Sequence, residues 1–230
     1  MKIDLNWRFC LALLAAIFVF GELHELAHLT VAYLVCGAPG HQTDFNLWTL
    51  CESCNTNPHA YVATLAGPVF SYVLMWTGFF LLRSKNSEKW QTGAVLVLSN
   101  IPFARIFTAA IGGGDETTVL RTLFVDQNVL LLKIIGFLIV FALAFPPLLM
   151  IWRRMTREHR FLRVFAVAAL PLPIMMMYEF KLLGRVLQSG FLSEAHFLGV
   201  ADFVYLHTVI MSVLMLVFCR TLLGTKLSGR

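Results

Sequence analysis

The chain has little charge. Of its 230 residues, 13% are Asp, Glu, Lys or Arg, and 58% are hydrophobic. Soluble domains carry roughly 25% charged and about 45–50% apolar residues. So few charges do not cover the surface of a soluble globule of this size. The composition therefore excludes an ordinary soluble domain and predicts an integral, multi-pass membrane protein.

Long basic runs, internal repeats and low-complexity segments are also lacking. The net charge is +5, but the Lys and Arg residues stand in short clusters between apolar stretches. That distribution is typical of the loops of membrane proteins, so it favours the lipid bilayer as a partner and argues against nucleic acid. We expect no removable signal peptide, because the first apolar run is long and leads directly into polar residues.

Several apolar stretches are long enough to cross a bilayer, which takes about 20 residues. They predict an all-α polytopic fold with about six transmembrane helices. The expected spans are Phe9–Val35, Ala60–Leu82, Thr92–Ile111, Val129–Trp152, Phe161–Phe180 and Phe203–Leu223.

Basic residues are divided unequally between the two sides of this predicted bundle. The side that carries both termini has thirteen: Lys2, Arg8, Arg83, Lys85, Lys89, Arg153, Arg154, Arg157, Arg160, Arg163, Arg220, Lys226 and Arg230. The opposite side has four: Arg121, Lys133, Lys181 and Arg185. Because cytoplasmic loops are rich in Lys and Arg, we expect both termini in the cytoplasm. The expected location is a plasma membrane, such as the bacterial inner membrane.

Titratable residues interrupt the first apolar stretch. His24-Glu25-Leu26-Ala27-His28 matches the pattern H-E-x-x-H. On a helix, residues i and i+4 project from one face, so both imidazoles can bind one zinc ion. Glu25 would then lie beside a metal-bound water as a general base. Ionisable residues inside a membrane are costly, which makes them functional candidates.

A catalytic zinc site usually has three protein ligands, so a third is expected from another span. The third apolar stretch ends in Ile111-Gly112-Gly113-Gly114-Asp115-Glu116, at the same predicted depth as His24. The glycines allow irregular backbone there. We predict Asp115 as the third ligand, with Glu116 in reserve. An ordinary helix end followed by a solvated acid is the other interpretation.

Three polar elements follow one another in the first half of the chain: HELAH in the first span, AGPVFS (Ala66 to Ser71) opening the second, and NIP…GGGD (Asn100 to Asp115) closing the third. In this order they resemble the site-2-protease family of intramembrane zinc metalloproteases. Gly67 and Ser71 fit the family's G-x-x-x-N/S/G element. The last element departs from the family's N-x-x-P…D-G pattern. Its Asn–Pro spacing is shorter, its Pro–Asp separation is longer, and Glu116 stands where the family has Gly. The resemblance covers about the first 120 residues.

The resemblance implies a zinc endopeptidase that cleaves membrane proteins or peptides. It implies that one zinc ion is held by His24, His28 and Asp115, with Glu25 as the base, and that Asn100, Gly67 and Ser71 contact the substrate. Residues 1–120 would form the protease core, and residues 121–230 would add three helices to the same bundle.

The loop between the first two spans has no basic residue. Its segment from Thr43 to Leu50 alternates between polar and apolar residues, like a short strand. The resemblance implies a β-hairpin that dips into the membrane and holds the substrate extended; a plain outer loop fits the sequence equally well. Cys51 and Cys54 favour a disulfide or free thiols over a second metal, and Cys36 is a further partner for a disulfide.

Arg105 lies within the third span, where a lone cation is costly, so it needs a partner. Glu22 is the first candidate and Glu179 the second.

Two other functions fit the same residues. One is a non-catalytic relative that binds membrane peptides or a metal, although such a protein has no need of Glu25 as a base. The other is a membrane zinc protease of a different type, in which Glu116 is the third ligand.

Overall fold

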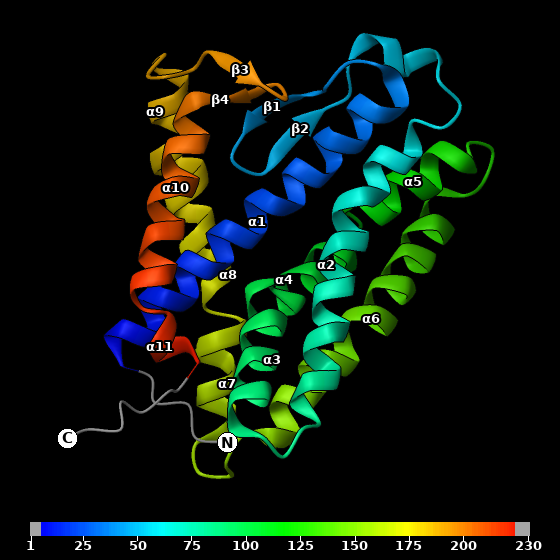
Figure 1. Cartoon of the computed structure of the whole chain (residues 1–230). Coiled ribbons are helices and arrows are strands. Elements are labelled where there is room, and N and C mark those ends of the chain that lie inside the picture. Colours follow the sequence, from blue (N-terminus) through cyan, green and yellow to red (C-terminus); the bar gives the residue numbers. More distant parts are fainter. Residues whose placement is uncertain (1–5, 224–230) are drawn as a thin grey trace.

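The computed structural model describes residues 6–223, and most of them are helical (Figure 1). The longest continuous helix is α1 (Trp7–Cys36), which runs obliquely through the molecule. It contacts α2 (Tyr61–Leu82) and α3 (Ser87–Ser99) on one side and α10 (Asp202–Val217) on the other. α1 is therefore the central helix of the bundle, and the H-E-x-x-H residues lie on it.

Both ends of α1 are capped. The Asn6 side chain accepts a hydrogen bond from the Phe9 N–H at 2.8 Å, which satisfies one of the free N–H groups of the first turn. The helix ends at Gly37, whose φ of 76° is left-handed and whose N–H bonds to the Tyr33 carbonyl. These caps set the length of α1 and place Cys36 at its end.

The predicted third span is a broken helix. Its two parts are α3 and α4 (Pro102–Ala110), joined at Asn100 and Ile101. Pro102 has no N–H to continue the ladder, and Ile101 adopts a left-handed φ of 41°. The break interrupts the hydrogen-bond ladder of the helix. It also leaves the polar side chain of Asn100 at this depth of the span.

The predicted fifth span is also interrupted. It consists of α7 (Arg160–Ala168), α8 (Pro171–Met175), the π-helical segment η2 (Met176–Leu183) and α9 (Gly184–Gln188). Pro171 ends the first part because proline cannot donate to the helical ladder. π-helical turns are rare and often occur at functional sites.

Within residues 6–223, four short strands form two hairpins. β1 (His41–Asp44) pairs with β2 (Leu47–Thr49), and β3 (Ala195–Phe197) pairs with β4 (Val200–Ala201), both antiparallel. The Gln42 N–H donates to the Gly199 carbonyl at 3.0 Å, so the hairpins meet at one end of the bundle (Figure 1). A hairpin is therefore present where the alternation of residues 43–50 predicted a strand.

The remaining elements are one long helix, α6, and several short segments. The 3₁₀ helix η1 (Glu52–Thr56) precedes α2, α5 (Asp115–Leu123) follows α4, and α6 (Val129–Arg154) follows α5. α11 (Cys219–Leu222) continues α10. The start of α1 and α11 lie at the same end of the molecule, where the Trp7 and Phe218 rings are 5.9 Å apart (Figure 1).

Five helices of the described chain are long and apolar enough to cross a membrane, rather than the six that the sequence predicted. They are Trp7–Cys36, Tyr61–Leu82, Ser87–Ala110, Val129–Arg154 and Arg160–Gln188. The sixth expected span corresponds to α10, whose 16 residues extend about 24 Å, less than the roughly 30 Å of a bilayer core. The fold is thus largely helical and polytopic.

Apolar side chains fill the interior and also form much of the outer surface. The largest core cluster joins α1, α3 and the start of the fifth span around Ile17, Leu98 and Val167. α6, in contrast, leaves Ile134, Leu138 and other large apolar residues exposed along its length. So large an apolar face is unfavourable in water, which identifies the chain as a membrane protein.

Small residues allow α2 and α3 to approach closely. A Cβ added to Gly93 would lie 2.6 Å from the Gly78 carbonyl oxygen and 2.9 Å from the Leu82 nitrogen, both backbone atoms that cannot swing away. Glycine at this contact therefore maintains the helix pair, as small residues do in membrane bundles.

We expect Gly93→Ala to lower the free energy of unfolding by about 1–3 kcal/mol, because the added methyl overpacks this contact. The matched control is Gly21→Ala on α1, where an added Cβ meets nothing within 4 Å. That substitution should leave the stability unchanged or raise it by up to about 1 kcal/mol. Unfolding of both variants in detergent micelles measures the difference; equal stability of the two would contradict the close packing.

Candidate metal centre

Two histidines on α1 face the same point. His24 and His28 are one helical turn apart, and their Nε2 atoms lie 3.1 Å from each other. Both side chains are buried, His28 completely. The helical repeat alone brings them onto one face, as the sequence predicted.

The carboxylate of Asp115 reaches this pair from another helix. Its Oδ2 atom is 3.5 Å from His24 Nε2 and 3.6 Å from His28 Nε2. Asp115 is the first residue of α5, and the chain turns toward α1 through Gly112 and Gly114, whose φ angles of 81° and 93° favour glycine. The glycine-rich turn therefore positions the carboxylate.

The three ligand atoms have the spacing of a metal site. Atoms bound at about 2.0–2.1 Å to a tetrahedral zinc lie about 3.3–3.4 Å apart. The observed separations of 3.1, 3.5 and 3.6 Å bracket that value. His24, His28 and Asp115 thus form a group able to hold a metal ion.

Hydrogen bonds at the far side of the rings orient both histidines. His28 Nδ1 lies 2.8 Å from the Ala63 carbonyl oxygen, which can only accept, so the proton is on Nδ1. The Nε2 lone pair of His28 is then free to bind a cation. Partners of this kind fix the tautomer and the orientation of metal-binding histidines.

Ser71 and Arg105 both lie beside the far nitrogen of His24. Its Oγ atom is 3.1 Å from His24 Nδ1 and 2.8 Å from Arg105 Nη2. Because a guanidinium can only donate, the Ser71 oxygen accepts from Arg105. Arg105 Nη2 also lies 2.8 Å from His24 Nδ1. Arg105, the positively charged residue of the third span, is therefore part of this site.

The partners expected for Arg105 were wrong. Glu22 accepts a hydrogen bond from Gln42, and Glu179 accepts one from Asn46, so both carboxylates bind amides of the first hairpin. Arg105 instead contacts Ser71 and lies over the ring of Tyr72. No pattern in the sequence distinguishes these partners, because they lie on other helices.

A cavity of about 260 Å³ opens beside the histidine pair. Its lining includes His24, Glu25, Asn100, Arg105 and Asp115. Glu25 is buried, and its Oε2 atom has no hydrogen-bond partner among the described residues; the same holds for Oδ1 of the buried Asn100. Arg105 Nε, on the same lining, also lacks a partner there. Buried polar atoms without partners are costly, so these atoms mark the cavity as a place for a polar ligand.

Gly67 packs directly against the histidines. A Cβ added there would collide with His28 Nε2 and would lie 2.6 and 2.7 Å from ring atoms of His24. The residue keeps open the space beside the ligand atoms. In the structure, Gly67 and Ser71 contact the histidines. Contact of either residue with a substrate stays a prediction.

Glu116, the reserve ligand, has a different partner. Its Oε1 atom accepts a hydrogen bond from the Tyr72 hydroxyl at 2.5 Å. Glu116 borders the cavity, but it is not one of the residues whose ligand atoms converge. The geometry therefore favours Asp115 as the third ligand.

The first hairpin covers the other side of the site. The Trp48 ring of β2 stacks on the His28 ring, with centroids 4.5 Å apart and an interplanar angle of 17°. Sequence reasoning missed this contact and also the Ala63 carbonyl, because neither residue carries a signal of its own. Only the pairing register of the hairpin decides which side chain meets His28.

No protein-family model, curated protein or solved structure matches the chain. The resemblance to site-2 proteases therefore stays a prediction from the three sequence elements.

We expect Gly67→Ala to weaken zinc binding by about 10–100-fold, as changes beside metal ligands do. The added methyl occupies the space next to both Nε2 atoms. Competition between the purified protein and a chromogenic zinc chelator measures the affinity, with Gly21→Ala as the control for an uncrowded glycine. Wild-type affinity in the Gly67 variant would show that the metal does not bind here.

Proposed function

We propose that this chain is an intramembrane zinc metalloprotease that hydrolyses peptide bonds of membrane-embedded proteins or peptides. The observation that carries the proposal is the convergence of His24 Nε2, His28 Nε2 and Asp115 Oδ2 within 3.6 Å, beside a cavity that Glu25 borders. An H-E-x-x-H pair with a third carboxylate ligand is a known donor set for catalytic zinc.

Bound zinc would lower the pKa of its water from 15.7 to about 7 and so supply hydroxide at neutral pH. The chain contributes the groups around that water. Glu25 lies next to His24 in the sequence and borders the same cavity, with a free carboxylate oxygen. It would accept the proton of the attacking water and pass it to the leaving amine.

The substrate would occupy the cavity with its backbone extended, because a helix shields its own peptide bonds. Asn100 supports this interpretation: its free Oδ1 atom is suited to accept a hydrogen bond from a substrate N–H. In our proposal, a substrate segment would add as a strand to the first hairpin, which Trp48 holds against His28, and this would present a peptide bond to the site.

The rest of the chain fits an enzyme embedded in a plasma membrane, such as the bacterial inner membrane. In our proposal, α10 with α11 completes a sixth crossing and the hairpins dip into the outer leaflet. Both ends of the chain would then be cytoplasmic, as the excess of Lys and Arg on that side favours.

We expect Glu25→Gln to retain zinc and to lower the rate of cleavage by about 10²–10⁴-fold, the usual contribution of a general base. The matched control is Glu22→Gln, a buried glutamate on the same helix whose partner Gln42 is a hairpin amide. It should stay within about tenfold of the wild type. The assay uses a mixture of single-span peptides in vesicles, with products identified by mass spectrometry. Full activity of the Glu25 variant, or no cleavage by zinc-loaded wild type, would sink the proposal.

The third ligand is tested separately by metal content. Asp115→Ala should lose most of the bound zinc, because it removes an atom within 3.6 Å of both histidines. Glu116→Ala should keep it, since Glu116 bonds to Tyr72. Metal analysis of the two purified variants distinguishes this enzyme from a protease that uses Glu116; the opposite pattern of loss would favour the latter.

A further inference from the structure

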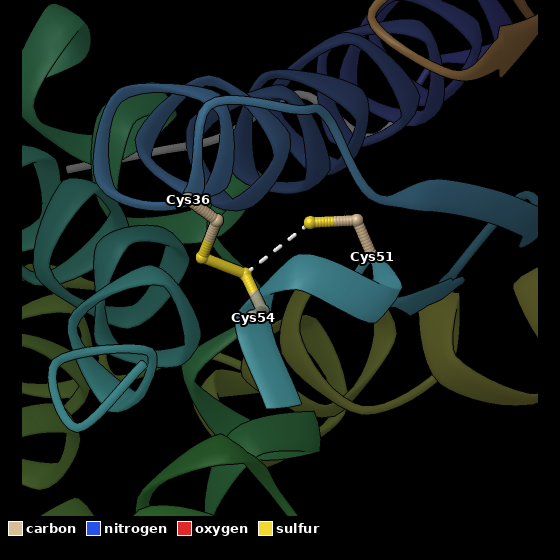
Figure 2. A group of neighbouring side chains, drawn as sticks. All are labelled: Cys36, Cys51 and Cys54. Carbon is tan, nitrogen blue, oxygen red and sulfur yellow. Dashed lines mark hydrogen bonds between the residues drawn. A yellow bond between two sulfur atoms is a disulfide. The ribbon is translucent and has the colours of Figure 1, made fainter. Parts of the chain in front are cut away.

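Three cysteines meet where α1 ends. Cys36 is the last residue of α1, Cys51 directly precedes η1, and Cys54 lies within η1. Their sulfur atoms all lie within 4.8 Å of one another. Figure 2 shows the Cys54 sulfur between the other two. The proposed peptide hydrolysis uses none of them.

Two of the cysteines are bonded and the third is in contact with the bond. Cys36 and Cys54 form a disulfide, and Cys51 is a free thiol. The Cys51 sulfur lies 3.4 Å from the Cys54 sulfur (Figure 2). A thiolate exchanges with a disulfide by attacking one of its sulfurs, and here the nucleophile is already in contact with its target.

We propose that these residues form a thiol–disulfide exchange site. The Cys51 thiolate attacks the Cys54 sulfur, a Cys51–Cys54 bond forms, and the Cys36–Cys54 bond breaks. The electron pair leaves on the Cys36 sulfur, which takes up the proton that Cys51 lost. The number of disulfides does not change, so the step needs no oxidant or reductant.

The backbone suits both disulfides. Cys51 and Cys54 have the C-x-x-C spacing of thiol–disulfide exchange motifs. The end of α1 does not depend on the Cys36 bond alone, because the Ser53 hydroxyl donates to the Cys36 carbonyl at 3.0 Å and the Asn57 amide donates to the Val35 carbonyl at 2.8 Å. Exchange therefore changes the covalent link while these hydrogen bonds hold α1 against η1.

Exchange moves the free thiol toward solvent. Cys51 and Cys54 are buried, at 8% and 1% exposure, whereas Cys36 is half-buried. In the second isomer, the free thiol is thus at the accessible position. Its chemical partner would be a low-molecular-weight disulfide: the Cys36 thiolate attacks one sulfur of that molecule and releases the other half as a thiolate. This inference is independent of the proposed protease activity.

The experiment follows the free thiol in the full-length protein. Cys10 and Cys219 are first replaced by serine, and the protein is treated in detergent with iodoacetamide, quenched with acid, digested and mapped by mass spectrometry. We expect label at Cys36 to exceed label at Cys51 by about tenfold, because alkylation follows accessibility. The Cys51–Cys54 linkage should accumulate as Cys36 is labelled.

Two variants serve as controls. Cys51→Ser should keep the Cys36–Cys54 linkage and lose the label at Cys36, whereas Cys36→Ser should form Cys51–Cys54 and leave no free thiol at the cluster. The same digestion of the unsubstituted chain reports the linkages if the serine background does not fold. Label confined to Cys51 with Cys36–Cys54 intact would overturn the proposal. So would recovery of all three as thiols together with one equivalent of bound metal.

Discussion

Two imidazole nitrogens and a carboxylate oxygen face one another within 3.6 Å in the interior of an apolar helix bundle. In water such groups would each be solvated; here the proton on His28 Nδ1 leaves a lone pair directed at the other two atoms. Buried acceptors without donors are strongly destabilising. A divalent cation bound at their centre would remove that cost. Ala63 and Ser71 hold the rings, and Gly67 leaves the centre free.

Breaks in the helices supply the other polar groups at the same depth. A continuous helix satisfies its own backbone and brings few polar atoms into a bilayer. Pro102 interrupts the third span beside Asn100, and the turn through Gly112 and Gly114 brings Asp115 back toward α1. Each break lies at the edge of the cavity, because Asn100, Ile101 and Gly114 all line it.

Hydrogen bonds to two buried carboxylates hold the first hairpin against this site. Glu22 of α1 and Glu179 of η2 are buried carboxylates, and each binds an amide of the hairpin, Gln42 or Asn46. Carboxylates at this depth are expensive unless they are hydrogen-bonded. Their use here fixes the hairpin against α1, which explains how Trp48 comes to stack on His28. The disulfide at Cys36 ties the same helix to η1, a few residues farther along.

The sequence by itself determined what depends on local periodicity and composition. Apolar runs identified the long helices, and the spacing of His24 and His28 placed both rings on one face, because the helical repeat is a property of neighbouring residues. It also singled out Asp115, since a run of glycines marks a turn. Only the tertiary structure decided which partners meet across the bundle: Arg105 contacts Ser71 rather than Glu22 or Glu179, Cys54 pairs with Cys36, and Glu116 turns to Tyr72. It likewise decided that α10 is shorter than a full span. These contacts join residues far apart in the chain, and their choice depends on how several helices pack at once, which no local pattern encodes.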